Sequence, residues 1–240
     1  MMDAADKDRV AAGWFRHAWD DYVDGLPVLI PVLLLQTLIY APALWLVYRY
    51  HSFLPSIPYL LLVVTPVATG ANLVYIKLAR GSGARVADLF GAFPVYGRAL
   101  GVSLWLGFLT IAGTMLLIVP GIILYLTYCF SEYAVVDKRT GVKESFALSA
   151  AMTEGWKGRL FLILSLTLLV NLMVPEVVMT EGTLSAPSLK FNLGAWNVVS
   201  DALKTLVFLP WLRIVMARAY DSLLAPRPPV EDVPEADDQP

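Results

Sequence analysis

Residues 98–161 read RALGVSLWLGFLTIAGTMLLIVPGIILYLTYCFSEYAVVDKRTGVKESFALSAAMTEGWKGRLF, and this stretch decides the fold. Between Arg98 and Asp137 the only charged residue is Glu132, which is far fewer charges than a soluble surface carries. A helix rises about 1.5 Å per residue and a bilayer core is about 30 Å thick, so one helix over this segment, roughly 57 Å long, is too long to cross once. The segment must therefore fold back on itself.

The fold-back is expected at Pro120 and Gly121. Proline suits the first turn of a helix, and glycine gives a turn its conformational freedom. We therefore predict two membrane helices, 99–119 and 120–136, joined tightly over residues 118–121. Basic residues flank both outer ends of the pair, which places these ends on the same side of the membrane.

The composition indicates lipid as the solvent of most of the chain. Hydrophobic residues make up 58% and charged residues 16%, and the mean hydropathy is +0.63. A soluble domain has about 25% charged residues. The net charge of −2 gives no basic field for nucleic acid, so we expect no nucleic-acid partner. Cys129 is the single cysteine, which excludes a disulfide within the chain and a cysteine-based zinc site.

Four further segments have the length and composition of membrane spans, which makes six in total: 26–48, 59–78, 159–175 and 196–219. The pieces 86–93 and 142–152 are amphipathic and are expected at the interface, and residues 176–192 are expected to form a polar loop. The predicted fold is an all-α, polytopic membrane helix bundle with six transmembrane helices and amphipathic interfacial helices.

Three regions are expected along the chain. Residues 1–25 form a cytosolic amphipathic N-terminal helix, in which Val10, Trp14, Ala18 and Tyr22 recur at four-residue spacing. This helix either lies at the membrane surface or docks onto a partner. Residues 26–224 form the six-helix membrane domain, whose first apolar segment resembles an uncleaved signal anchor. Residues 225–240 are acidic and rich in proline, which is typical of a disordered tail.

The positions of lysine and arginine predict how the chain is threaded. With both termini in the cytoplasm, all but three of the 18 basic residues lie on cytoplasmic flanks. The exceptions are Arg49 and Lys190 on the opposite side and Lys204 inside the sixth helix. This asymmetry favours a multi-pass protein of a bacterial inner membrane with both ends inside.

Two adjoining segments carry a resemblance to a known family. They read IVPGIILYLTYCFSEYAVVD and GVKESFALSAAMTEGWKGRLF. The chain resembles the YciC-like bacterial inner-membrane proteins, which are related to the membrane domain of glycerophosphoryl diester phosphodiesterases. The resemblance covers about residues 59–224, implies a polytopic membrane fold and brings no established reaction. Glu132 departs from the family pattern. The positions that match are Pro120, Gly121, Ile122, Tyr128, Asp137, Ala147, Ser149, Met152, Gly155, Lys157, Leu160 and Phe161.

Ionisable residues at membrane depth are the best sequence indication of function. Glu132 lies about one helical turn from the inner boundary, where it snorkels to the cytosolic interface, pairs with Arg139 or Lys138, or serves a relay. Asp201 and Lys204 are three residues apart on the sixth helix, so they share a face and are expected to pair. A proton or ion relay that uses both sites is the functional alternative.

Other polar and small residues have packing and lipid-binding interpretations. Asn72 and Asn171 are expected to hydrogen-bond across to neighbouring helices, because an unpaired amide in lipid is costly. Ser103 and Gly107 form a small-xxx-small step for close helix packing. Trp156, between Gly155 and Lys157, suits contact with anionic lipid head groups, although topogenic charge explains these residues equally well.

No catalytic set is evident, so we expect no enzyme and name no catalytic, cofactor-binding or metal-ligating residue. The two histidines, His17 and His51, fall on opposite sides of the threaded chain. The first hypothesis is a non-enzymatic protein that supports or organises the membrane or envelope. The alternative is a transporter or channel-like protein for a small solute or lipid. The expected partner is the bilayer, including anionic head groups, and both a membrane-protein partner and a homo-oligomer stay open.

Overall fold

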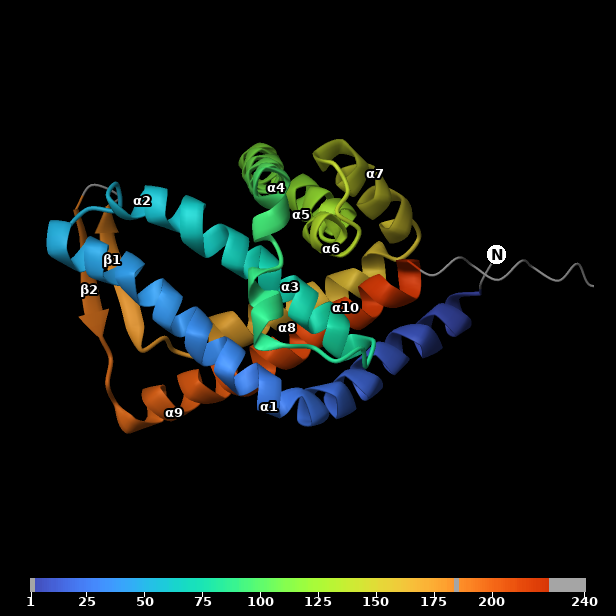
Figure 1. Cartoon of the computed structure of the whole chain (residues 1–240), viewed down its shortest axis with the longest axis horizontal. Coiled ribbons are helices and arrows are strands. Elements are labelled where there is room, and N and C mark those ends of the chain that lie inside the picture. Colours follow the sequence, from blue (N-terminus) through green and yellow to red (C-terminus); the bar gives the residue numbers. More distant parts are fainter. Residues whose placement is uncertain (1–2, 184–185, 225–240) are drawn as a thin grey trace, which may run out of the picture.

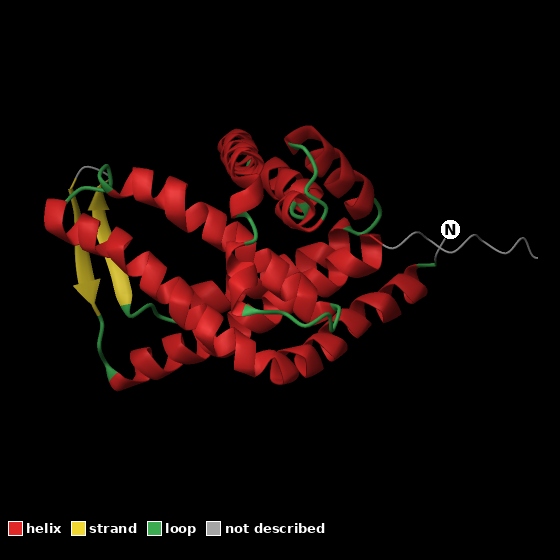
Figure 2. Cartoon of the chain, in the orientation of Figure 1, coloured by secondary structure: helices red, strands yellow, loops and turns green. Residues whose placement is uncertain are grey.

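The computed structural model describes residues 3–183 and 186–224, and the predicted tail at 225–240 lies outside them. The described chain is almost entirely helical, with a single two-stranded sheet at one end of the long axis (Figure 2). The all-α prediction is therefore confirmed. The elements in chain order are α1 (Ala4–Tyr50), α2 (Ser56–Tyr59), η1 (Leu60–Val64), α3 (Thr65–Ala79), η2 (Val86–Phe90), η3 (Phe93–Val95), α4 (Tyr96–Leu116), α5 (Ile118–Tyr128), α6 (Ser131–Asp137), α7 (Val142–Thr153), α8 (Lys157–Met173), β1 (Val178–Thr183), β2 (Ala186–Phe191), α9 (Ala195–Leu203), η4 (Lys204–Phe208) and α10 (Leu209–Leu224).

The first helix does not break at residue 25. The predicted cytosolic helix and the predicted first span are one continuous helix, α1. Gly25 and Pro27 together resemble a helix end, but Gly25 has another purpose: a Cβ there would lie 2.9 Å from the side chain of Leu78 in α3. The glycine therefore lets two helices approach closely, and the helix continues through it.

The amphipathic half of α1 packs against the end of its own chain. Trp14 donates a hydrogen bond from Nε1 to Ser222 Oγ at 2.8 Å, and Arg218 binds both oxygens of Asp21 at 2.6 Å. Figure 1 shows this half of α1 running beside α10. The buried face of the N-terminal helix is thus occupied by the bundle itself.

The region 176–192, predicted as a polar loop, contains a β-hairpin, so this prediction was wrong. Strands β1 and β2 pair antiparallel, with Val178 opposite Phe191 and Thr183 opposite Ala186. Almost every residue of both strands is partly or fully exposed. A strand without a buried face has no hydrophobic alternation to reveal it in the sequence.

The predicted fold-back between α4 and α5 is present, and its hinge is Leu117. The backbone of Leu117 is extended (φ −164°, ψ 144°) and separates the two helices. Pro120 and Gly121 lie in the first turn of α5. A Cβ on Gly121 would lie 2.7 Å from the backbone nitrogen of Thr114, so only glycine fits where the two helices meet.

The tip of this hairpin is apolar and uncovered. Figure 1 views α4 nearly end-on, whereas α1 and α3 run across the view, so the α4–α5 pair crosses the other helices steeply. Exposure at the tip reaches 84% at Met115 and is still 64% at Val119. The large side chains exposed there are Met115, Leu116, Leu117, Ile118 and Val119.

The predicted helix 120–136 is divided into α5 and α6, and Ser149 explains the break. Its hydroxyl donates to the carbonyl oxygen of Thr127 at 2.9 Å and accepts from the backbone N–H of Phe130 at 3.1 Å. A side chain from α7 therefore satisfies two backbone groups that the break releases. Ser149, a candidate site residue, has this structural role and is fully buried.

Four helical segments are long and apolar enough to cross a membrane: 4–50, 56–79, 86–116 and 118–137. A fifth is obtained when α7 and α8, which are bent by 104°, count together. Large apolar side chains are exposed along several of these segments, for example Leu38 and Leu172. Such a surface is unusual for a protein in water and compatible with one in a membrane.

Replacing Gly121 with leucine should destabilise the chain by about 1–3 kcal/mol, because overpacking in a tight contact forces neighbouring atoms apart. Thermal unfolding of the purified protein in detergent measures the change. Gly107→Leu is the matched control, since a Cβ at Gly107 meets no atom within 4 Å. Equal losses in the two variants would contradict the close approach at Gly121.

Candidate functional site: a polar cavity inside the bundle

A cluster of charged side chains joins the ends of three helices. Arg80, directly after α3, donates two hydrogen bonds to Asp137 of α6 at 2.5 and 3.0 Å. Its Nε donates to Asp221 of α10 at 2.6 Å. Tyr220 of α10 donates from its hydroxyl to Asp137 at 3.1 Å. We call these four residues the Arg80 cluster.

The protonation states in the Arg80 cluster favour its hydrogen bonds. The hydrogen bond with Asp137 raises the pKa of Arg80; burial opposes this, and Asp221 adds to the rise. Burial raises the pKa of the Tyr220 hydroxyl, and the negative charge of Asp137 raises it further. Both groups therefore stay protonated as donors. Asp137, a candidate site residue, fixes the helix ends.

The same three helices line a cavity of about 470 Å³, which we call the central cavity. Helix α1 and the segments α4 and η4 complete its wall. Its lining is half polar, which is unusual between packed membrane helices. The lining residues are Leu33, Gln36, Val64, Thr65, Ala68, Thr69, Ala71, Asn72, Tyr75, Ser103, Glu132, Thr205, Leu209, Pro210 and Arg213.

Glu132 lies in the wall of the central cavity, held by a short chain of hydroxyls. Ser103 of α4 donates to its Oε1 at 2.6 Å, and Ser103 is 3.3 Å from the hydroxyl of Thr69 in α3. No base forms an ion pair with Glu132 among the described residues, so the predicted pairing with Arg139 or Lys138 is absent. The step from Ser103 to Gly107 is not a packing seam, because Gly107 has no neighbour there.

Arg213 is the cation of the cavity. It lies seven residues before Tyr220 on α10, about 10 Å along the helix from the Arg80 cluster. Its side chain is exposed, yet it lines the central cavity and a second one. With the described residues its guanidinium makes neither a hydrogen bond nor an ion pair. The sequence assigned Arg213 to a cytoplasmic flank; the structure adds that its side chain lines two cavities.

Several neutral polar groups of the central cavity also have no protein partner. Asn72 is buried and, among the residues that the structure covers, its amide makes no hydrogen bond. The predicted bond across to another helix is therefore wrong for Asn72. It is also wrong for Asn171, whose amide donates to Thr167 of its own helix at 2.8 Å. Gln36 and Tyr75 likewise present side chains to the cavity without a bond to described residues.

Two more cavities adjoin the central one. The second, of about 260 Å³, shares Glu132, Leu209 and Arg213 with it. Tyr133 lines this second cavity, and its hydroxyl is fully buried without a hydrogen-bond partner in the described part of the chain. The third, of about 340 Å³, is mostly apolar and shares Gln36 and four other residues with the central cavity. Hollow space thus runs through much of the bundle.

Both π-helical segments of the described chain end at this hollow space. Val64, the last residue of η1, and Thr205 of η4 line the central and third cavities. The carbonyl of Leu60 accepts the backbone N–H of Thr65 and also its Oγ1, the latter at 3.0 Å. Short π-helical turns are frequent at functional sites.

The remaining candidates from the sequence lie away from the cavity. Asp201 and Lys204 form the predicted ion pair at 2.9 Å, and Lys204 is buried with Glu176 3.9 Å away. Gly155 has a positive φ of 75° and accepts a hydrogen bond from Lys7. Lys157 begins α8. The structure does not bring Asp201 or Lys204 together with Glu132 at one cavity.

Trp156 does not face lipid head groups. It is buried, its ring centroid is 5.5 Å from that of Trp14, and the Lys7 ammonium lies 5.6 Å from its ring. The interpretation of Trp156 as a lipid contact was therefore wrong. Within residues 3–183 and 186–224, no three His, Cys, Asp or Glu side chains gather as a metal ion requires.

Comparisons with protein-family models, with curated proteins and with solved structures found no match to this chain. The site is therefore described by its own geometry.

Replacing Arg80 with glutamine should lower the free energy of unfolding by about 2–3 kcal/mol, because it leaves the buried Asp137 carboxylate with only the exposed Lys138 ammonium, 3.6 Å away, as its cation. Thermal unfolding in detergent measures the loss. Lys143→Gln removes an exposed base on α7 and should change stability by less than about 0.5 kcal/mol. Asp137→Asn should cost less in the Arg80→Gln background than alone; strict additivity would contradict the pairing.

Proposed function

We propose that this chain is a polytopic membrane protein that binds a small solute or lipid in its central cavity and passes it through the bundle. It is thus a transporter or channel-like protein. One observation carries this proposal: Arg213, Asn72, Gln36 and Tyr75 present polar groups to one cavity without protein partners. Polar groups in a ligand site have this arrangement, because the ligand completes their hydrogen bonds.

A protein that only supports the membrane has no use for such a cavity. An arginine at membrane depth is expensive, and a bundle selected for stability alone would pair it or replace it. Elsewhere this chain does pair its charges, as Arg80 and Arg218 show. The unpaired guanidinium therefore supports the transporter or channel-like function over the support function. An enzymatic role has no supporting observation.

The helices around the cavity are interrupted where it lies. Segment 56–79 changes to a π-helical turn at η1, and segment 195–224 changes at η4. Discontinuous helices that surround a midplane site are a common design of transporters. The interruptions therefore agree with a bound and moving ligand.

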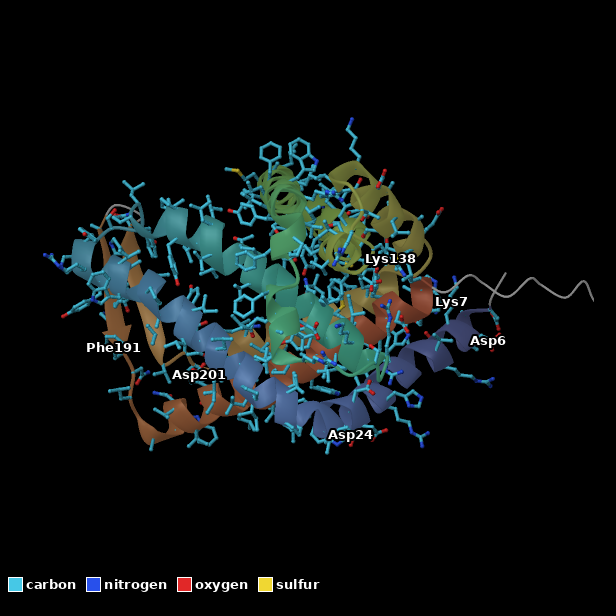
Figure 3. All side chains as sticks on the ribbon, in the orientation of Figure 1. Asp6, Lys7, Asp24, Lys138, Phe191 and Asp201 are labelled. Atoms are coloured by element: carbon cyan, nitrogen blue, oxygen red, sulfur yellow. The ribbon has the colours of Figure 1, made fainter. Side chains whose placement is uncertain are left out.

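The proposed placement is a bacterial inner membrane with six membrane segments and both termini in the cytoplasm. The fifth and sixth segments are α8 and the run of α9, η4 and α10. Figure 3 shows Lys7 and Lys138 towards one end of the long axis, and Asp201 and Phe191 towards the other. The two labelled lysines, which the proposed threading assigns to the cytoplasm, thus lie towards the same end. Membership of the YciC-like family is part of this proposal.

This threading predicts which single cysteines a membrane-impermeant thiol reagent reaches in intact spheroplasts. In a Cys129→Ala background, Ser52→Cys and Ser188→Cys should react from outside, whereas Gly83→Cys and Lys143→Cys should react only after the membrane is opened. Mass spectrometry of the labelled protein measures the reaction. Labelling of Gly83→Cys in intact spheroplasts would contradict the threading.

The transport proposal predicts that the central cavity is reached by water from both sides. Ala68 is exposed, and it lines the central and third cavities. In the Cys129→Ala background, Ala68→Cys should react with a charged thiol reagent in right-side-out and in inside-out vesicles, because a thiolate forms only where water reaches.

Leu34→Cys is the control for this experiment, since Leu34 is equally exposed on α1 but lines none of the three cavities. It should stay unlabelled in both vesicle orientations. If Ala68→Cys reacts from one side only, the cavity does not pass its ligand, and if it reacts from neither side, the cavity is closed. Either result would contradict the proposed function.

A further inference from the structure

We propose that the ligand of the central cavity is a small zwitterion, with an oxyanion bound by Arg213 and an ammonium bound by Glu132. This inference rests on the proposed function and names its ligand class. Two sources share the chemistry: a lipid head group of the phosphoethanolamine type and a soluble amino acid or amino phosphate.

Arg213 indicates that the ligand carries an oxyanion. A guanidinium does not lose its proton in proteins and offers donors in a planar fork that fits carboxylates and phosphates. Here none of these donors is used by the described residues, and the side chain lines both cavities. An anionic group in the cavity would satisfy the fork and neutralise the charge at once.

Glu132 indicates that the ligand carries an ammonium group. Its carboxylate accepts one hydrogen bond, from Ser103, and leaves its other oxygen without a described donor. Glu132 and Arg213 line the same two cavities without forming an ion pair with each other. The two charges are therefore presented separately, and a ligand that carries both opposite charges satisfies both.

Tyr133 gives an independent indication. Its hydroxyl is buried without a partner in the described chain, beside the residues that carry both charges. A buried hydroxyl left unpaired destabilises a protein. A ligand oxyanion would accept this hydrogen bond next to Arg213.

The size of the cavity agrees with such a ligand. Its volume of about 470 Å³ lies within the range of about 300–1,000 Å³ that is typical of small-molecule sites. The mostly apolar third cavity adjoins it and would accommodate part of a hydrocarbon chain if the ligand is a lipid.

The test is the thermal unfolding of the full chain, purified in detergent and stripped of lipid. O-phosphoethanolamine should raise the unfolding midpoint in a saturable way, because a ligand that binds only the folded state stabilises it. Inorganic phosphate should need at least tenfold higher concentrations, and ethanolamine alone should have no effect.

Glycine and short-chain phosphatidylethanolamine distinguish the two sources of the ligand. If the ligand is a lipid, the phosphatidylethanolamine should bind at least tenfold more tightly than glycine. If the ligand is a soluble amino acid or amino phosphate, the reverse is expected.

Single substitutions test which residue binds each charge of the ligand. Arg213→Gln should abolish the response while keeping the ligand-free midpoint, since Arg213 makes no hydrogen bond that the change would remove. Arg9→Gln, which changes an exposed arginine far from the cavity, should respond as the natural chain does. Glu132→Gln should reduce the preference for O-phosphoethanolamine over phosphate to less than threefold. Tyr133→Phe should weaken binding without lowering the ligand-free midpoint.

The inference is overturned if no zwitterion stabilises the natural chain, or if Arg213→Gln responds as strongly as Arg9→Gln. Labelling of Ala68→Cys from both sides would then leave the proposed function intact with a ligand of another class. If Ala68→Cys also fails to react from both sides, then the proposed function is contradicted together with the inference.

Discussion

The ion pair between Arg80 and Asp137 determines how the other charges of the bundle are arranged. With Asp221 and Tyr220 it joins the ends of α3, α6 and α10, which are also the helices that carry Asn72, Glu132 and Arg213. Because the three helices are fixed relative to one another at this end, the groups one to three turns further along are held at fixed positions. Three of the carboxylates on these helices and on α1 are engaged with Arg80 and Arg218, which leaves Glu132 as the acid that shares the cavities with Arg213.

The polar groups of this chain fall into two classes: those that are hydrogen-bonded within the protein, and those that face the central cavity without a protein partner. Ser149, Asn171 and the pair of Asp201 and Lys204 are satisfied within the protein, and each stabilises a break or a helix face. The groups around the central cavity are not satisfied, although an unpaired polar group costs most where the dielectric constant is low. Tyr96 and Trp211 also bury a polar atom without a partner in the described chain, but around the central cavity several such groups gather at one place, which is evidence of a site.

Much of the fold could be predicted from local sequence signals, because a membrane span or the turn near Pro120 is determined by residues that are close together in the sequence. The continuity of α1 could not, since Gly25 resembles a helix end until Leu78 is known to lie against it. The hairpin of β1 and β2 was missed because its strands have no buried face. Glu132 was recognised as the one charge in an apolar stretch. Arg213 was not, because a base near the end of a span is usually a topological signal, and only the packing shows that it faces a cavity.

The hinge at Leu117 has a consequence for how deep the α4–α5 hairpin sits. Leu117 donates its N–H to Gly113, and Gly121 donates to Leu117. Pro120 has no N–H at all, so among the described residues only Ile118 and Val119 keep free amides at the tip of α5. The last carbonyls of α4 are free in the described chain as well, so the tip combines apolar side chains with backbone groups that need a polar partner, which suits the boundary between acyl chains and head groups. Each arm of the hairpin is long and apolar enough to cross the hydrocarbon core, so the turn at Leu117 would lie at the boundary opposite to the Arg80 cluster.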